Sequence, residues 1–182
     1  MKKVTMKDFR WLGKPQHWEK TYKDLSLTVE GNLCLPEGPL LLAVSDEDFT
    51  LTVQTTTAPK GGYCGVCLYH TERTYTAVGR SKAGLSVETS INSYKTTADI
   101  PIPTDEENIC WHLERRAKEV RIGYSDPFTA EVQWLCSTSL PGMKDAVSFG
   151  AFFSNHTNAP FNAKMHSLSY VKNDVPVSEP LV

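Results

Sequence analysis

The chain has 182 residues, of which 40% are hydrophobic and 22% are charged, and its formal net charge at pH 7 is -2. This composition is typical of a soluble globular protein, and so balanced a charge excludes the basic surface of a nucleic-acid-binding protein. No apolar run reaches the roughly 20 residues that cross a bilayer, so we expect no membrane partner. The basic start lacks the apolar stretch of a signal peptide, which predicts a cytoplasmic protein.

The N-terminal segment contains two tryptophans, Trp11 and Trp18, on either side of Gly13 and Pro15. Glycine and proline disfavour a helix here, and the two indole rings need apolar surroundings. We therefore expect both rings to fix this segment to the body of the protein. The alternative is that they are platforms on which sugar rings stack.

Eleven stretches have the composition and alternation of short β-strands, and none has the period of an amphipathic helix. In chain order they are 25–30, 40–44, 49–55, 63–70, 74–80, 85–91, 109–115, 120–124, 131–136, 146–153 and 161–171. A long polar connection is expected over Asn92–Asn108, which contains two prolines. This pattern predicts an all-β fold, an antiparallel two-sheet β-sandwich that forms a single domain over residues 1–182. Residues 172–182 are expected to fray.

The five cysteines are an odd number without a secretion signal, which indicates reduced thiols rather than disulfides. Cys64 and Cys67 have the spacing of a redox or zinc motif, but both lie in a predicted strand. Residues three apart on a strand face opposite sides, so we expect two diverging, half-buried thiols. The acidic turn Asp46–Asp48 lacks the glycine and ligand spacing of a calcium loop. The sequence therefore predicts no metal site and no cofactor.

No catalytic motif is apparent in the sequence. A retaining glycosidase needs two carboxylates about 5 Å apart, yet Glu88, Glu114 and Glu131 lie on different predicted strands. Two of these residues, most plausibly Glu88 and Glu114, would have to meet across a sheet. The Gly-x-Ser-x-Gly turn that presents a serine nucleophile is absent, and the five histidines lack metal-ligand spacing. We therefore assign no catalytic residue.

Strand alternation does yield a candidate binding face. If Val66 and Leu68 point into the core, then Cys67 and Tyr69 point to the opposite side of the sheet. Sugar sites combine aromatic rings with polar groups that bind hydroxyls. The expected ligand-binding residues are Tyr69, Tyr75, Arg80, Glu88, His112, Glu114 and Gln133. The alternative is that they form cross-strand pairs on a solvated sheet, and a one-residue slip in register would invert the assignment.

Several stretches resemble a family of concanavalin A-like proteins that includes the fungal protein called regulation of enolase. The start Phe9-Arg-Trp11, with Pro15 and Trp18, is similar to the family's Phe-x-Trp-x-x-x-Pro-x-x-Trp pattern. Cys64–Tyr69, Tyr75–Gly79 and Leu85–Thr89 resemble three of its strands, and 146–153 with 161–170 its closing pair. The resemblance implies a jelly roll whose concave face holds sugars in related domains. The family's Lys and Glu are Ala77 and Ser81 here, which implies an altered site.

Together these observations predict a cytoplasmic protein that binds a carbohydrate or sugar-derived ligand on a concave sheet without catalysis. The first alternative is a glycoside-processing enzyme that uses Glu88 and Glu114. The second is a protein-interaction module that uses the exposed sheet and the Asn92–Asn108 segment. The sequence leaves the ligand and the oligomeric state open.

Overall fold

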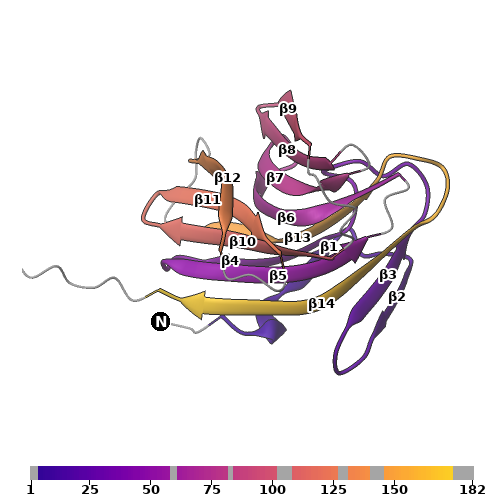
Figure 1. Cartoon of the computed structure of the whole chain (residues 1–182), viewed down its shortest axis with the longest axis horizontal. Coiled ribbons are helices and arrows are strands. Elements are labelled where there is room, and N and C mark those ends of the chain that lie inside the picture. The colour runs from indigo at the N-terminus through magenta and orange to yellow at the C-terminus, as the bar shows by residue number, and fades with distance from the viewer. Residues whose placement is uncertain are drawn as a thin grey trace, which may run out of the picture.

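The computed structural model describes residues 4–57, 61–81, 84–101, 108–126, 131–139 and 146–173. Within these ranges, one short 3-10 turn, η1 (Met6–Asp8), is followed by fourteen strands in two antiparallel seven-stranded sheets (Figure 1). No helix in the described part of the chain has the length and apolar character of a membrane span. The predicted all-β, antiparallel two-sheet sandwich is confirmed.

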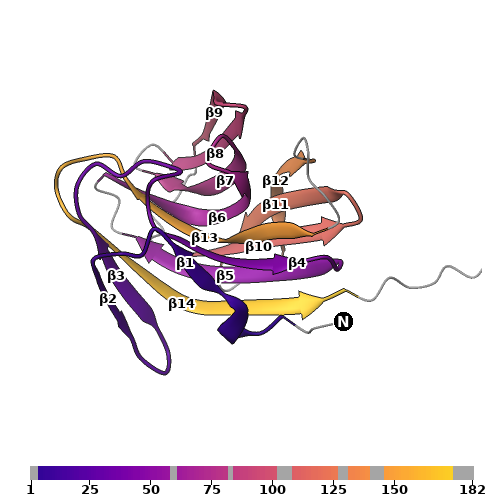
Figure 2. The same cartoon turned by 180° about the vertical axis from the view of Figure 1, so that it is seen from behind.

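We call the two sheets A and B. The strand order in sheet A is β1 (Arg10–Leu12), β4 (Leu40–Ser45), β13 (Val147–Asn155), β6 (Gly62–Thr71), β7 (Thr74–Ser81), β8 (Gly84–Ile91) and β9 (Tyr94–Ile100). The order in sheet B is β12 (Gln133–Thr138), β11 (Glu119–Ser125), β10 (Asn108–Arg116), β5 (Phe49–Thr57), β14 (Phe161–Lys172), β3 (Leu25–Val29) and β2 (His17–Lys20). Both views of the molecule show β9 as the outermost strand of sheet A (Figures 1 and 2).

Each of the eleven predicted strands has a counterpart, and the β6–β7–β8 meander is as expected. Three further strands were not predicted: β1, β2 and β9. The expectation of a loop over Asn92–Asn108 is wrong for its first half, which forms β9. Asn92 and Ser93 have φ values of 51° and 72°, so they form the tight two-residue turn that joins β8 to β9. Residues 102–107 and the predicted frayed tail over 174–182 lie outside the described residues.

Apolar side chains from the inner faces of both sheets form one core between them. Phe149 of β13 is fully buried there, and its ring lies 4.1 Å from that of Phe49 on β5. Trp111 on β10 is also fully buried, and its Nε1–H donates to Thr55 Oγ1 at 2.9 Å. The pattern of alternation explains this arrangement, because successive residues of a strand face opposite sides.

The two N-terminal tryptophans have different environments. Trp11 on β1 packs against the core, with its ring centroid 6.4 Å from that of Phe153. Trp18 on β2 is 41% exposed, so the expectation that both rings are buried against the rest of the protein is wrong for Trp18. It lines an open groove of about 810 Å³ along β2, β3 and β14, and the ammonium of Lys14 lies 4.9 Å from its ring centroid.

Cys64 and Cys67 lie on opposite faces of β6. Cys64 belongs to the core between the sheets, whereas Cys67 belongs to a second apolar cluster on the outer face of sheet A. The predicted divergence of the two sulfurs is therefore confirmed. Both residues are at most 1% exposed, so they are fully buried rather than half-buried.

We expect these two thiols to resist alkylation by iodoacetamide at pH 8 in the folded protein. Burial raises the pKa of both to about 12, so only about one in 10⁴ is the reactive thiolate at that pH. Peptide mapping by mass spectrometry should show no label on either residue until urea is added. The half-exposed Cys34 is the internal control for slow native labelling. Native labelling of Cys67 as fast as that of Cys34 would contradict the described packing.

Candidate functional site

The outer face of sheet A carries a second buried apolar cluster. Its members are Leu35, Leu40, Leu42, Tyr63, Cys67, Tyr75, Ala77 and Phe152. Side chains on the outer face of a flat sheet are normally exposed, but Tyr75 and Ala77 are at most 1% exposed. Sheet A curves upward from β6 to β9 (Figure 1), and the outer side chains are buried by packing against one another and against Leu35. We call this surface the concave face.

A loop before β4, Leu33–Pro39, folds over the concave face, and we call it the Leu35 loop. Leu35 is 4% exposed, and it belongs to the same apolar cluster as Cys67 and Ala77, which are small side chains on β6 and β7. The carbonyl of Leu35 accepts a hydrogen bond from Lys95 Nζ at 2.9 Å and lies 3.4 Å from the hydroxyl oxygen of Tyr75. The Leu35 loop therefore covers part of the concave face.

A polar group borders this apolar cluster on β8 and β9. The Tyr75 hydroxyl donates to Glu88 Oε1 at 2.5 Å, and Lys95 Nζ lies 3.5 Å from the same oxygen. Burial, together with the neighbouring Glu88 carboxylate, raises the pKa of Tyr75, so the phenol stays neutral and donates. The side chain of Glu88 is 13% exposed and that of Lys95 is 48% exposed. The result is a carboxylate held in one orientation beside an accessible ammonium group.

Three of the predicted ligand-binding residues, Tyr69, Tyr75 and Glu88, share the concave face. Tyr69 pairs with Tyr75 across β6 and β7, and it packs against the edge of the apolar cluster. Lys95 completes this group, and sequence reasoning missed it because β9 was expected to be a loop. The signal that could have revealed β9 is its content of Tyr94, Thr96, Thr97 and Ile100 after an Asn-Ser turn.

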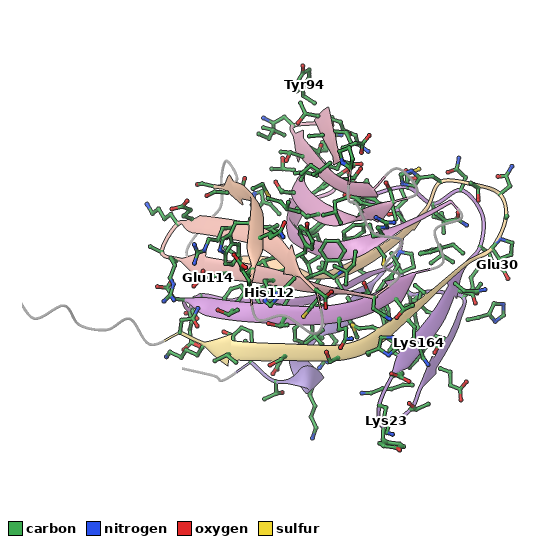
Figure 3. The ribbon with its side chains drawn as sticks, viewed as in Figure 1. Lys23, Glu30, Tyr94, His112, Glu114 and Lys164 are labelled. Atoms are coloured by element: carbon green, nitrogen blue, oxygen red, sulfur yellow. The ribbon has the colours of Figure 1, made fainter. Side chains whose placement is uncertain are left out.

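The other four predicted residues do not lie on this face. Arg80 pairs with Cys64 and Leu85, which point into the core, so it is on the inner side of sheet A. It follows Tyr75 by five residues, and alternation alone places the two on opposite faces. His112 and Glu114 lie on the outer face of sheet B (Figure 3). Gln133 begins β12 and accepts a hydrogen bond from the Tyr124 hydroxyl at 2.8 Å.

Glu114 is held by ion pairs. Its side chain is 7% exposed, and its Oε1 lies 2.8 Å from Arg116 Nη2, while Oε2 pairs with Arg121. The guanidinium of Arg121 also stacks over the Trp134 ring at 4.0 Å. Glu88 and Glu114 thus project from the outer faces of different sheets, with the core between them. The hypothesis that they act as a catalytic pair is wrong, because such carboxylates must lie within about 5 to 10 Å.

His112 is part of a polar ladder on the outer face of sheet B. Its Nε2 lies 2.8 Å from Ser125 Oγ, and burial lowers the pKa of the imidazole. A histidine in this state is neutral at physiological pH. Ser125 lies opposite Cys110, so the contact is a diagonal one between neighbouring strands, of the kind that stabilises a sheet.

A second polar network on sheet B was not predicted. His166 Nε2 lies 2.5 Å from Thr56 Oγ1, and its Nδ1 lies 2.9 Å from Asp24 Oδ1. The order hydroxyl, imidazole, carboxylate resembles a nucleophile relay. However, Thr56 lies within regular strand β5 and its hydroxyl also contacts Asn108, so it is not presented on a sharp turn. His166 occupies the extra position of a β-bulge in β14, and we interpret the network as support for that bulge.

The acidic end of this network is also paired. Asp24 Oδ2 lies 3.1 Å from the ammonium of Lys164, which is labelled in Figure 3. Hydrogen bonds from Lys164 and His166 lower the pKa of Asp24. The described residues contain no group of three His, Cys, Asp or Glu side chains placed to hold a metal ion.

No protein-family model matches the sequence, and no curated protein matches it. Solved structures do match in fold. A protein from Saccharomyces cerevisiae described as functionally unknown is 12% identical with a TM-score of 0.81, over 94% of this chain and 100% of that one. The carbohydrate-binding module CBM66 from Bacillus subtilis is 11% identical with a TM-score of 0.56, over 88% and 94%.

The GH43 protein BlXynB from Bacillus licheniformis is 13% identical with a TM-score of 0.72. The match covers 91% of this chain but only 37% of that one, so the chain corresponds to about a third of the GH43 protein. At such low identity the likeness concerns the fold alone. It shows that this chain shares its two-sheet β-sandwich with the CBM66 module and with part of the GH43 protein.

Proposed function

We propose that this chain binds a carbohydrate or sugar-derived ligand on the concave face of sheet A, without catalysis. The observation that carries the proposal is the Tyr75–Glu88–Lys95 group beside the half-buried Tyr69. A carboxylate accepts hydrogen bonds from two sugar hydroxyls, an ammonium donates to a third, and an aromatic ring stacks on the apolar face of a pyranose. Glu88 is fixed by the Tyr75 hydroxyl, so it is oriented before a ligand arrives.

The geometry of the carboxylates among the described residues supports a binding site rather than a retaining or inverting glycosidase pair. Glu88 has a tyrosine and a lysine as its polar neighbours on the concave face, and Glu114 lies on the other sheet. The likeness in fold to CBM66 and to GH43 proteins supports a sugar as the ligand. One further structure with the same fold is described as a xylan β-1,4-xylosidase from Bacillus halodurans, and another is described as a xyloglucan GH43 protein from Bacteroides ovatus. Xylose-containing oligosaccharides are therefore the first ligands to test.

The test is a thermal-shift screen followed by titration calorimetry with xylo-oligosaccharides, xyloglucan fragments, monosaccharides and sugar phosphates. A ligand at 100 times its Kd should stabilise the fold by about 2.7 kcal/mol, which gives a readable rise in Tm. Glu88→Gln removes a charged acceptor and should weaken binding about tenfold or more. Glu72→Gln makes the same change at a 75% exposed side chain on the β6–β7 turn, and it should leave the Kd unchanged. Absence of any sugar-dependent shift in the wild-type chain would overturn the proposal.

We also propose that the chain belongs to the concanavalin A-like family that includes the regulation of enolase protein. Support comes from the motifs around Trp11, Tyr75 and Leu85 and from the likeness to a whole Saccharomyces cerevisiae protein.

We also propose a single domain over residues 1–182, which agrees with the core that both sheets share. A cytoplasmic location agrees with the five free cysteines. The net charge of -2 favours a small-molecule ligand over nucleic acid or an anionic membrane surface.

A further inference from the structure

Strand β9 forms one edge of sheet A, and among the described residues no strand pairs with its outer side. It has seven residues, of which the first six have exposed side chains. Its pairing with β8 continues without a shift in register, whereas the edge strands β1 and β2 have three and four residues and β12 contains a register shift. Natural proteins usually protect an edge with charged side chains, a proline, a bulge or a short strand. Strand β9 has the charged residues Lys95 and Asp99, but it has no proline and no bulge and it is seven residues long.

The hairpin turn determines which backbone groups of β9 are free. In a two-residue hairpin the pair next to the turn, here Ile91 and Tyr94, exchanges hydrogen bonds, and alternate pairs then do the same. Tyr94, Thr96, Ala98 and Ile100 therefore bond to β8. The N–H and C=O groups of Lys95, Thr97 and Asp99 point outward, where a further strand can bind them.

The side chains of β9 are self-complementary. When a second copy of the strand is placed antiparallel with Thr97 opposite Thr97, each Lys95 lies opposite an Asp99 and each Tyr94 lies opposite an Ile100. The two Lys–Asp pairs are of opposite charge and lie on the concave side, where Lys95 also donates to the Leu35 carbonyl and Asp99 also accepts from the Ser86 hydroxyl of its own chain. The Tyr–Ile pairs are apolar. Tyr94 is 75% exposed and projects from the tip of β9 into solvent (Figure 3), so a partner strand would cover a large apolar ring.

We infer that the chain forms a two-fold symmetric homodimer by antiparallel pairing of β9 with β9 of a second copy. About six backbone hydrogen bonds join the two strands around Thr97. The pairing converts the two A sheets into one continuous sheet and leaves no long regular edge among the described strands. We infer a second copy rather than another protein as the partner, because the sequence of β9 is complementary to itself. In the antiparallel register each charged residue lies opposite one of opposite charge, and each end residue lies opposite an apolar one. The inference uses the edge of the sheet and does not depend on a sugar ligand.

Sedimentation velocity of the full chain across a concentration series tests this inference. The wild-type chain should sediment as a dimer at high concentration. Thr97→Pro removes an outward N–H without removing a bond to β8, so it should yield a monomer with an unchanged circular dichroism spectrum. Thr97→Val keeps the N–H and should remain a dimer, which makes it the matched control.

Two charge variants provide a second, independent arm. Lys95→Asp and Asp99→Lys each place like charges opposite one another twice, and each should weaken dimerisation about tenfold or more. When the two folded variants are mixed, both charge pairs between positions 95 and 99 become attractive, so a heterodimer should form. A monomeric wild-type chain at every concentration would overturn the inference. Dimerisation that Thr97→Pro leaves intact, or a mixture that stays monomeric, would also overturn it.

Discussion

Leu35→Ala is expected to lower the free energy of unfolding by about 2 to 5 kcal/mol and, at the same time, to tighten sugar binding. Leu35 is 4% exposed within the apolar cluster of the concave face, so truncation removes buried methyl groups and leaves a cavity. The same side chain covers part of the concave face on which we propose that a ligand binds, so the Leu35 loop and the ligand compete for that surface. A loop that opens ten times more often gives an apparent Kd about tenfold lower. Urea unfolding followed by tryptophan fluorescence measures the first effect, and calorimetry measures the second.

Val44→Ala is the matched control for this variant. Val44 lies on β4, on the same side of the strand as Leu40 and Leu42, which belong to the cluster of Leu35. Its side chain is 61% exposed, so its truncation should change stability by less than about 0.5 kcal/mol. The two readouts of Leu35→Ala are separable. Lower stability without tighter binding would show that the Leu35 loop does not compete with the ligand. Unchanged stability would contradict the packing of Leu35 itself.

Phe149→Ala is expected to have the largest effect on stability, a loss of about 3 to 5 kcal/mol. The residue is fully buried, and its ring contacts those of Phe49 and Tyr170 on sheet B at 4.1 and 5.8 Å. It also meets Phe9 of the N-terminal segment edge-on at 6.0 Å. This one ring therefore joins both sheets and the segment before β1. Calorimetry should record a fall in Tm of about 6 to 20 °C.

Two comparisons identify the cause of that loss. Phe149→Leu keeps much of the apolar volume, so its loss should be clearly smaller. Val171→Ala removes methyl groups from a side chain that is 56% exposed on β14, and it should be nearly neutral. A loss below about 1 kcal/mol for Phe149→Ala would show that the aromatic cluster is not the main contact between the sheets.

Local alternation was sufficient to predict which residues of one strand share a face. It correctly placed Cys64 opposite Cys67, and Tyr69 on the same side as Cys67. It also placed His112 and Glu114 together, opposite Trp111 and Leu113. These predictions succeeded because the period of side chains along a strand is fixed by backbone geometry.

The common face assumed for Tyr69 and His112 was wrong because alternation does not determine the sheet to which a strand belongs. β10 pairs with β5 and β11, far from the meander of β6 to β8. That arrangement depends on long-range pairing between strands distant in sequence. Strand β9 was missed for a different reason: its side chains face solvent, so it lacks the apolar alternation that identifies a half-buried strand.

β6 is buried on both faces over its first seven residues, from Gly62 to Leu68. A slip of one residue normally carries apolar side chains into water, but here either register would place them in apolar surroundings. The register of β6 must therefore be set by steric fit against its neighbouring strands rather than by burial. Gly65 lies opposite Gly79 on β7, and a Cβ at Gly65 would lie 2.1 Å from the Val78 carbonyl oxygen. During folding, this pair of glycines excludes a slipped β6, because any larger side chain brought to that point collides with the neighbouring backbone.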